Sequence, residues 1–541
     1  MLRLQNDRFG WSERDTGVMT NIVGADAAVS CVAPVLPSIL KIAEKKNVRM
    51  NRAARVMLER EEALRVTARD VKVLEDVQMN GALARTGLAH QRVALRFFQL
   101  MEDYGYHNFL VTDATGVGKT WEALMWARRK VTPHGRILVV TKNNAKEQWA
   151  DTIQHYLGEQ PIRIVEGTIA EQVQQAKTKT ARWVIAHWES LARAGNGYLA
   201  RSWDAVILDE AHYISNRKAQ RSTTVFRLKS PHKMALTAHP YSNDPAELFS
   251  ILRFLYPQQY KSYWRFFHMH VKATPKQWGG FDIEGPRRAK TLRWELEPFN
   301  IGRTKPQVFK SLPQLTRSAL RIALTTRGER EYTRLKKELF AELDGLDGGT
   351  KVIPIINDLS RLTRVRQYLI DPALIGGREP SVKYPEVYEL MDTAQVPVVV
   401  FTQFKQAALR LGAWLHKRDK KLRIAYIHGG MRKQVQGIKK RFLAGELDAV
   451  ICVYAAASEA LNLGKYGYLI HLDLPWTPRT LEQAEGRVDR MEEFTGKTVP
   501  TTATRIIIKN SYEERLEGKL SKKHRNFAKV FTVTDLRKLF A

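Results

Sequence analysis

From about residue 88 onward, short apolar runs alternate with longer amphipathic stretches, and each run is followed by polar, turn-prone residues. A first series of runs occupies 137–140, 183–186, 205–208 and 234–236, and a second occupies 396–401, 424–426, 449–453, 469–472 and 504–508. Alternating strands and helices are typical of parallel sheets covered by helices on both faces. The pattern therefore predicts an α/β protein with two parallel-sheet lobes.

Changes in this pattern set the expected domain boundaries. We expect a small, mostly helical accessory region at 1–80, a first lobe at 81–270, and a helical insertion and linker at 271–380. A second lobe at 381–541 would end in a basic helix. A Gly/Asp-rich break at 344–349 indicates a loop near the junction. Residues 1–80 carry no chemical motif, so we assign them only a contact with a protein partner.

The charge of the chain indicates a polyanionic partner. Among 541 residues, 87 Lys and Arg stand against 56 Asp and Glu, a formal net charge of +31, whereas 44% hydrophobic residues is ordinary for a globular protein. Nucleic acid is the leading candidate for such a partner. Two cysteines cannot build a disulfide framework, and no run reads as a secretory signal or a membrane span. We therefore expect a cytoplasmic protein with no membrane contact.

The stretch 110–130, LVTDATGVGKTWEALMWARRK, has the layout of a phosphate-binding loop between a strand and a helix. Backbone N–H groups at the start of such a helix surround phosphates, a lysine reaches the β- and γ-oxygens, and a hydroxyl binds Mg²⁺. The residues in these roles are Thr115, Gly116, Gly118, Lys119 and Thr120. Asp113 stands where the strict pattern has its first glycine.

A second motif, WDAVILDEAH at 203–212, joins a buried strand to two adjacent carboxylates. Asp209 can hold Mg²⁺, and Glu210 can orient and deprotonate the attacking water. With the phosphate loop upstream, the pair predicts ATP hydrolysis with Mg²⁺ as cofactor.

These motifs resemble those of superfamily-two helicases, whose second motif is Asp-Glu-Ala-His. The family's third motif corresponds to 236–240, where Ala238 and His239 depart from Leu-Thr-Gly-Thr-Pro. Its sixth motif, Gln-x-x-Gly-Arg-x-x-Arg, corresponds to 483–490. Gln483, Arg487 and Arg490 share one face of a helix, and two guanidiniums can neutralise charge developing on the γ-phosphate. The resemblance implies two RecA-like lobes with ATP in the cleft between them.

Further segments resemble the Swi/Snf-type DNA translocases, over roughly 88–525. They include LAHQR at 88–92, in which Gln91 would read the adenine edge, and 141–149, which ends in Gln-Trp. The others are 241–260, GRTK at 302–305 with Leu-Pro at 312–313, VVVFTQF at 398–404, DLPWTP at 473–478 and SYEE at 511–514. At 453–463 the chain departs from the family, because Ala457, Ser458 and Ala460 replace glycines that allow close approach to phosphate. We expect altered coupling there, with Asn462 retained.

The resemblance implies an ATP-dependent motor that tracks one strand of double-stranded or branched DNA through phosphate contacts. Lys142, Asn143, Trp188, Lys405 and Asn462 are the candidate DNA contacts, and the alternative for Trp188 is the core. The motor would remodel branched DNA or displace bound proteins, in a prokaryote or a phage-infected cell. A fork-directed or single-strand helicase of the recombination or annealing type, a DNA-binding scaffold that has lost catalysis, and the motor of a restriction system remain alternatives.

Overall fold

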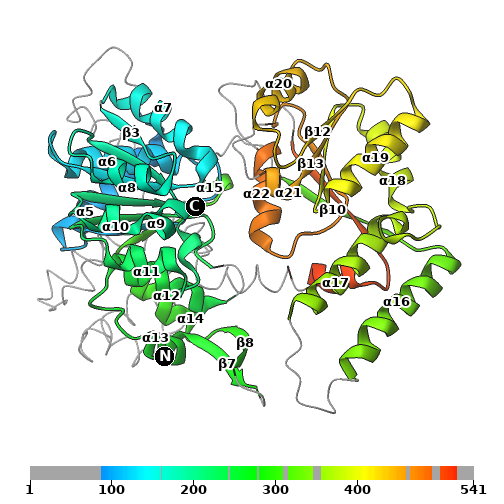
Figure 1. Cartoon of the computed structure of the whole chain (residues 1–541), viewed down its shortest axis with the longest axis horizontal. Helices are drawn as coiled ribbons and strands as arrows, with labels where there is room; N and C mark the ends of the chain where they lie inside the picture. The colour runs from blue at the N-terminus through cyan, green and yellow to red at the C-terminus, as the bar shows by residue number, and fades with distance from the viewer. Residues whose placement is uncertain are drawn as a thin grey trace, which may run out of the picture. The chain divides into compact units, whose positions relative to one another are not determined.

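The computed structural model describes residues 87–159, 161–241, 244–276, 280–308, 315–344, 355–457, 463–489, 500–518 and 520. They separate into two compact units, of which the first runs to Lys310 and the second begins at Ser311 (Figure 1). The expected accessory region 1–80 lies outside the described residues, as do Ser458, Ala460, Asn462 and Arg490. The basic tail at 519–525 is described only at Leu520.

The first unit is built on a seven-stranded sheet in the order β3-β4-β2-β5-β6-β1-β9, with every neighbouring pair parallel. Its strands are β1 Phe109–Val111, β2 Ile137–Thr141, β3 Ile162–Ile164, β4 Trp183–His187, β5 Ala205–Asp209, β6 His232–Leu236 and β9 Asn300–Ile301. β1, β2, β5 and β6 are almost wholly buried, and the first three are mostly apolar, as strands covered on both faces must be. The predicted α/β lobe is confirmed.

Helices of the first unit connect and cover these strands. They are α5 Ala89–Asp103, α6 Lys119–Lys130, α7 Lys146–Leu157, α8 Ile169–Lys177, α9 Trp188–Arg193, α10 Gly195–Leu199, α11 Gln220–Arg227, α12 Leu248–Leu255, α13 Tyr263–His270, α14 Ala289–Leu296 and α15 Lys305–Val308. Side-chain N-caps fix the starts of two of these helices. The Thr168 hydroxyl accepts a hydrogen bond from Glu171 N at α8, and the Ser262 hydroxyl accepts one from Arg265 N at α13. An antiparallel hairpin, β7 Val271–Pro275 and β8 Phe281–Pro286, follows α13.

The second unit has a six-stranded sheet in the order β10-β15-β14-β11-β13-β12, again parallel throughout. Its strands are β10 Thr316–Ile322, β11 Val398–Thr402, β12 Ile424–Ile427, β13 Ala449–Val453, β14 Tyr468–His471 and β15 Thr502–Ile508. Its helices are α16 Thr326–Asp344, α17 Ile355–Ile370, α18 Lys383–Ala394, α19 Lys405–Arg418, α20 Arg432–Leu443, α21 Tyr454–Ala457 and α22 Pro478–Val488. All five strands expected here are present, so the second predicted lobe is also confirmed.

A buried ion pair holds the sheet of the second unit to the segment after β15. Lys383 is fully buried, and its ammonium lies 2.7 Å from Glu513 Oε1 and donates to the carbonyl oxygens of Leu472 and Ile506. Glu513 also accepts from Ile508 N at 2.9 Å. Because each charge is satisfied by the other and by backbone groups, the pair can be kept out of water.

The interval 271–380, expected as a helical insertion, is divided between the two units. β9 belongs to the first sheet, where Leu110 N donates to Phe299 O and Thr112 N to Ile301 O, and β10 belongs to the second. A two-residue strand leaves no alternation to read in the sequence, and β10 lies on an exposed sheet edge where polar residues interrupt it. Among the described helices, none is long and apolar enough to span a bilayer.

Candidate ATP site

The phosphate loop lies where the sequence predicted it, between β1 and the N-terminus of α6. Gly116 and Gly118 adopt left-handed φ values of 86° and 99°, which residues with a Cβ rarely accept. Lys119 begins the helix, and its ammonium donates to the carbonyl oxygens of Asp113 at 2.7 Å and Ala114 at 3.1 Å. The loop therefore holds its own lysine beside the N–H groups of a helix start, the arrangement that binds phosphate.

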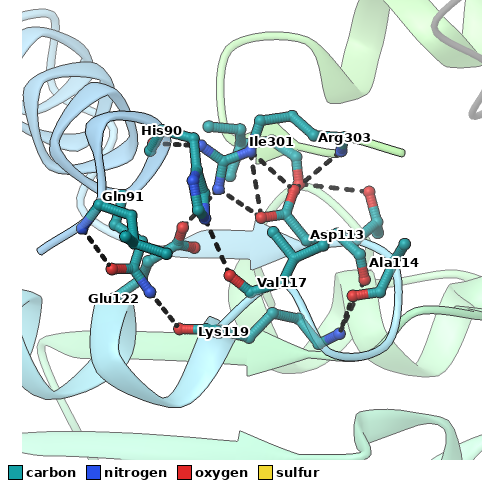
Figure 2. A network of polar contacts seen from close by, with 12 residues as sticks. His90, Gln91, Asp113, Ala114, Val117, Lys119, Glu122, Ile301 and Arg303 are labelled. Atoms are coloured by element: carbon teal, nitrogen blue, oxygen red, sulfur yellow. Dashed lines mark hydrogen bonds and ion pairs between the residues drawn. The ribbon is translucent and has the colours of Figure 1, made fainter. Parts of the chain in front are cut away.

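Two side chains from the start of α5 brace the far side of the loop. The His90 ring nitrogen Nε2 lies 2.9 Å from Val117 O, and Gln91 Nε2 donates to Gly118 O at 3.4 Å (Figure 2). Burial lowers the pKa of His90 to about 4, so the ring is neutral and Nε2–H is the donor. A Cβ at Gly118 would collide with the amide of Gln91. Gln91 thus fixes the loop, and its contact with adenine stays a prediction.

Arg303 is the centre of a buried network behind the loop (Figure 2). Its guanidinium contacts both oxygens of Asp113, an oxygen of Glu122 and the carbonyl oxygen of His90. Its backbone joins in as well, because Arg303 N donates to Asp113 Oδ1 at 2.8 Å and Ala114 N donates to Arg303 O at 2.9 Å. One residue thus ties the phosphate loop, α5 and α6 to the segment that leads to the second unit.

Asp113, which stands where the strict pattern has its first glycine, is an acidic partner of Arg303 in this network. Asp113 and Glu122 are both fully buried, and burial raises the pKa of Glu122 to about 8, a rise that Arg303 opposes. At neutral pH Glu122 is therefore mostly protonated, which reduces the negative charge buried beside Arg303. Arg303 lies in the predicted GRTK segment, but neither its role nor that of Glu122 was predicted from the sequence.

The two acidic residues of the second motif emerge at the end of β5. Asp209 Oδ2 accepts from the Thr141 hydroxyl at 2.7 Å and from Trp149 Nε1 at 3.0 Å. Burial, together with the neighbouring carboxylate of Glu210, raises the pKa of Asp209. A half-buried carboxyl held by two donors is oriented to meet a cation, which would favour its ionised form.

The pKa of Glu210 is shifted in the opposite direction from that of Asp209. Its backbone is left-handed, with φ 53°, at the point where β5 has ended. Burial disfavours its charge, but Lys142 at 3.5 Å and His212 at 3.2 Å hold the pKa of Glu210 well below its usual range. Glu210 is therefore ionised at neutral pH and able to accept a hydrogen bond from a water molecule.

His212 connects the second motif to the third. Its Nδ1 lies 3.2 Å from the Thr237 hydroxyl, which in turn accepts from His239 N at 3.2 Å. The connection uses Thr237, which matches the family, and only the backbone of His239, which departs from it. The substitutions Ala238 and His239 therefore leave this connection in place.

Two of the predicted DNA contacts have other partners. Trp188 is fully buried, stacks on Tyr213 with ring centroids 5.6 Å apart, and donates from Nε1 to Asp209 O at 3.2 Å. Its prediction as a DNA contact is wrong, because the indole orients the backbone of the second motif. Lys142 is paired with Glu210, so it too serves the ATP site. Asn143 and Lys405 are exposed and remain predictions.

In the second unit, α22 carries Gln483 and Arg487, with Gln483 half-buried and Arg487 buried. The helix is anchored by Glu485, whose carboxylate lies 2.7 Å from Arg317, 3.5 Å from Arg505 and 3.7 Å from His471. Burial opposes the charge, but His471 and Arg317 lower the pKa of Glu485 to about 2. The carboxylate between the two motif positions thus fixes the helix that presents Arg487.

The donors at the site suit Mg²⁺ bound to a nucleotide. The described residues contain no cluster of three or more His, Cys, Asp or Glu side chains able to hold a metal ion. Mg²⁺ needs no such cluster, because it is commonly bound by one or two protein oxygens together with phosphate oxygens and water. Thr120 and Asp209 are the residues that would hold it.

Comparison with known proteins identifies the family. The SNF2-related domain matches residues 90–374, and the helicase conserved C-terminal domain matches residues 383–492. The first match covers more than half of the chain, and the two matches together include the phosphate loop, the Asp209-Glu210 pair and α22. The chain belongs to the SNF2-related family.

Similar proteins come from bacteria, animals and archaea. YwqA of Bacillus subtilis, provisionally named an ATP-dependent helicase/translocase, is 24% identical over 458 residues, 80% of this chain and 47% of YwqA. Human chromodomain-helicase-DNA-binding protein 8 is 24% identical over 78% of this chain and 17% of its own. The chain thus spans less than half of either relative. The Sulfolobus solfataricus SWI2/SNF2 ATPase core in complex with dsDNA has 22% identity and a TM-score of 0.39, covering 85% of this chain and 99% of that one.

Proposed function

We propose that this protein is a DNA-dependent ATPase that uses ATP hydrolysis to translocate along double-stranded DNA. The observation that carries the proposal is the first unit's constellation: a phosphate loop with Lys119 at its helix start, and Asp209 and Glu210 at the end of β5 in the same sheet. Family membership supports the motor, and the net charge of +31 supports a polyanionic track. Remodelling of branched DNA or displacement of bound proteins is the work we propose for it.

In this mechanism the chain's own residues position ATP and polarise water. Lys119 and the N–H groups of α6 hold the phosphates, while Glu210, kept ionised by Lys142 and His212, accepts a hydrogen bond from the attacking water. When bound, Mg²⁺ would neutralise developing phosphate charge. Arg487 of the second unit, with Arg490, is the proposed source of positive charge at the γ-phosphate, which would couple turnover to movement of the two lobes.

The alternative of a scaffold without catalysis is not favoured by the geometry. A decayed site would have no reason to keep Glu210 in a left-handed conformation between Lys142 and His212, or to keep Asp209 between two donors. Carboxylates with shifted pKa values held this close together are typical of a site that handles charge.

ATP turnover with and without linear duplex DNA tests the proposal. We expect duplex DNA to stimulate the wild-type chain and Lys119→Ala to lose turnover by about 100-fold or more, with DNA binding retained, because its contact is to phosphate of ATP. Arg487→Ala should behave in the same way. Lys177→Ala, an exposed lysine at the end of α8, is the control and should turn over normally. Turnover retained by Lys119→Ala would contradict the proposal.

A further inference from the structure

An aromatic and basic surface in the first unit has no part in the ATP site. It is formed by the exposed side chains of α13 and of the β7–β8 hairpin, which lies beside α13 and extends from the unit (Figure 1). Phe267 and Val271 are buried beneath it, with Phe281 and Ile283 packed against them. This small core makes the α13–hairpin surface a fixed part of the fold, not a loose loop.

Trp264 is the most exposed large aromatic side chain among the described residues, with 51% of its surface accessible. Its ring stacks on His268, with centroids 5.9 Å apart and planes 26° apart, and meets Phe267 edge-on at 5.6 Å. Phe281 of the hairpin lies 5.9 Å away. The indole is thus held in one orientation by its neighbours while half of it stays in water, an arrangement that a core residue does not need.

Cationic side chains surround this ring. Residues 261–290 contain seven exposed Lys and Arg residues against two Asp and Glu, a local net charge of +5: Lys261, Arg265, Lys272, Lys276, Arg287, Arg288 and Lys290 against Asp282 and Glu284. Lys272 is paired with Glu284 at 2.6 Å, which leaves the excess to the others. Arg287 donates to His268 O at 3.1 Å, so one guanidinium is fixed beside the residue on which Trp264 stacks.

We propose that the α13–hairpin surface binds unpaired nucleotides of DNA, with a base stacked on Trp264 and backbone phosphates bound by Arg265 and the other exposed cations. An intact duplex would need only the cationic side chains of this surface, which contact its phosphates, because its bases are already stacked on one another. An oriented, half-exposed indole within a basic surface is the combination that binds single strands, in which every base offers an aromatic face. This inference rests on the proposed function, since it assumes that DNA is the track.

The consequence is a preference for DNA that has both paired and unpaired parts. The motor would bind its duplex track elsewhere, and the α13–hairpin surface would add affinity wherever a single strand leaves the duplex. A base stacked on an aromatic side chain contributes about 1–3 kcal/mol, so loss of the ring should weaken binding of such DNA roughly 5- to 150-fold.

Binding by the full-length chain to two DNA probes tests the inference. The probes are a blunt linear duplex and the same duplex with a single-stranded oligothymidine tail, measured by fluorescence anisotropy. Trp264→Ala should lower affinity for the tailed probe by the stated factor and leave affinity for the blunt probe within about twofold. Trp264→Phe should recover most of the loss, because it restores an aromatic face. Ile169→Ala, at a residue 52% exposed on α8, is the control and should bind both probes normally.

Two results separate this inference from the proposed function. If Trp264→Ala binds the tailed probe as tightly as the wild type, or loses both probes equally, the inference is overturned even when duplex DNA still stimulates turnover. If the wild type shows no DNA-stimulated turnover, the proposed function fails, and a tail-dependent loss in Trp264→Ala would still establish the surface as a single-strand site.

Discussion

Replacement of Arg303 by methionine should destabilise the first unit more than any other single loss of charge at the phosphate loop. The guanidinium is buried and is the cation that contacts both Asp113 and Glu122. Methionine fills similar volume without charge, so the change removes electrostatic partners with little change in packing.

The magnitude follows from what remains buried after the change. Removing one partner of a buried ion pair costs about 3–5 kcal/mol, because it leaves a carboxylate without compensation. Glu122 limits the loss, since its raised pKa of about 8 means that it is already protonated at neutral pH. Asp113 also loses its ion-pair partner, and the melting temperature of a unit of this size should fall by roughly 6–20 °C.

Urea denaturation followed by tryptophan fluorescence measures this loss. The largest fully buried tryptophans, Trp126, Trp183, Trp188 and Trp203, all belong to the first unit, so the signal reports chiefly on it. Arg129→Met is the matched control. Arg129 also pairs with a carboxylate, Glu102, but Lys130 contacts the same oxygen at 2.7 Å and would keep it compensated. We expect Arg129→Met to lower the free energy of unfolding by less than about 1 kcal/mol.

The ATP site should respond as well. Asp113 and Ala114 supply the carbonyl oxygens that hold Lys119, and both are bonded to Arg303. We expect Arg303→Met to raise the KM for ATP about 10-fold under conditions in which the variant is folded, and Arg303→Lys to recover part of the loss. A variant with wild-type stability and wild-type KM would refute the reasoning, because the network would then support neither the fold nor the loop.

Two further predictions concern buried carboxyl groups. The pKa of Glu122 is about 8 in the folded state and 4.5 ordinarily, so between these values the folded state keeps a proton that the unfolded state releases. As the pH rises from 4.5 to 8, the free energy of unfolding should therefore fall by up to about 1.4 kcal/mol per pH unit. Glu122→Gln should lack this slope in denaturation curves at pH 5–8.5, and an unchanged slope would exclude Glu122 as its source. Glu485 has the opposite sign: its pKa of about 2 contributes stability that is complete above pH 4.5 and lost as pH falls towards 2. Glu485→Gln should therefore destabilise the second unit at pH 7 and also lower turnover, because its helix carries Arg487; normal turnover would contradict this role.

Much of the site could be predicted because it depends on short, local patterns. The phosphate loop needs two glycines and a lysine at fixed spacing, and the structure gives those glycines their left-handed conformation. Most strands of both sheets, but not β3, β9 or β10, were predicted because buried parallel strands are continuous apolar runs. The contacts of Thr141 and Trp149 with Asp209 can be understood once β2 is known to lie beside β5, because Asp209 then emerges next to them.

The interactions that sequence reasoning missed join segments far apart in the chain. Arg303 meets Asp113 across 190 positions, through a two-residue strand that has no periodicity. Trp188 was predicted to contact DNA because it follows a strand end, but its position on α9 turns the indole into the core under Tyr213. The exposure of Trp264 depends on how α13 and the hairpin pack, which no local pattern specifies.

The most direct test of translocation is displacement of a third strand from a linear DNA triplex. A motor that tracks duplex DNA must push off a triplex-forming oligonucleotide in its path, and release can be followed by fluorescence. The account predicts release that requires both ATP and an intact Lys119, and that slows as salt weakens phosphate contacts. Duplex-stimulated ATP hydrolysis without release of the third strand would contradict it.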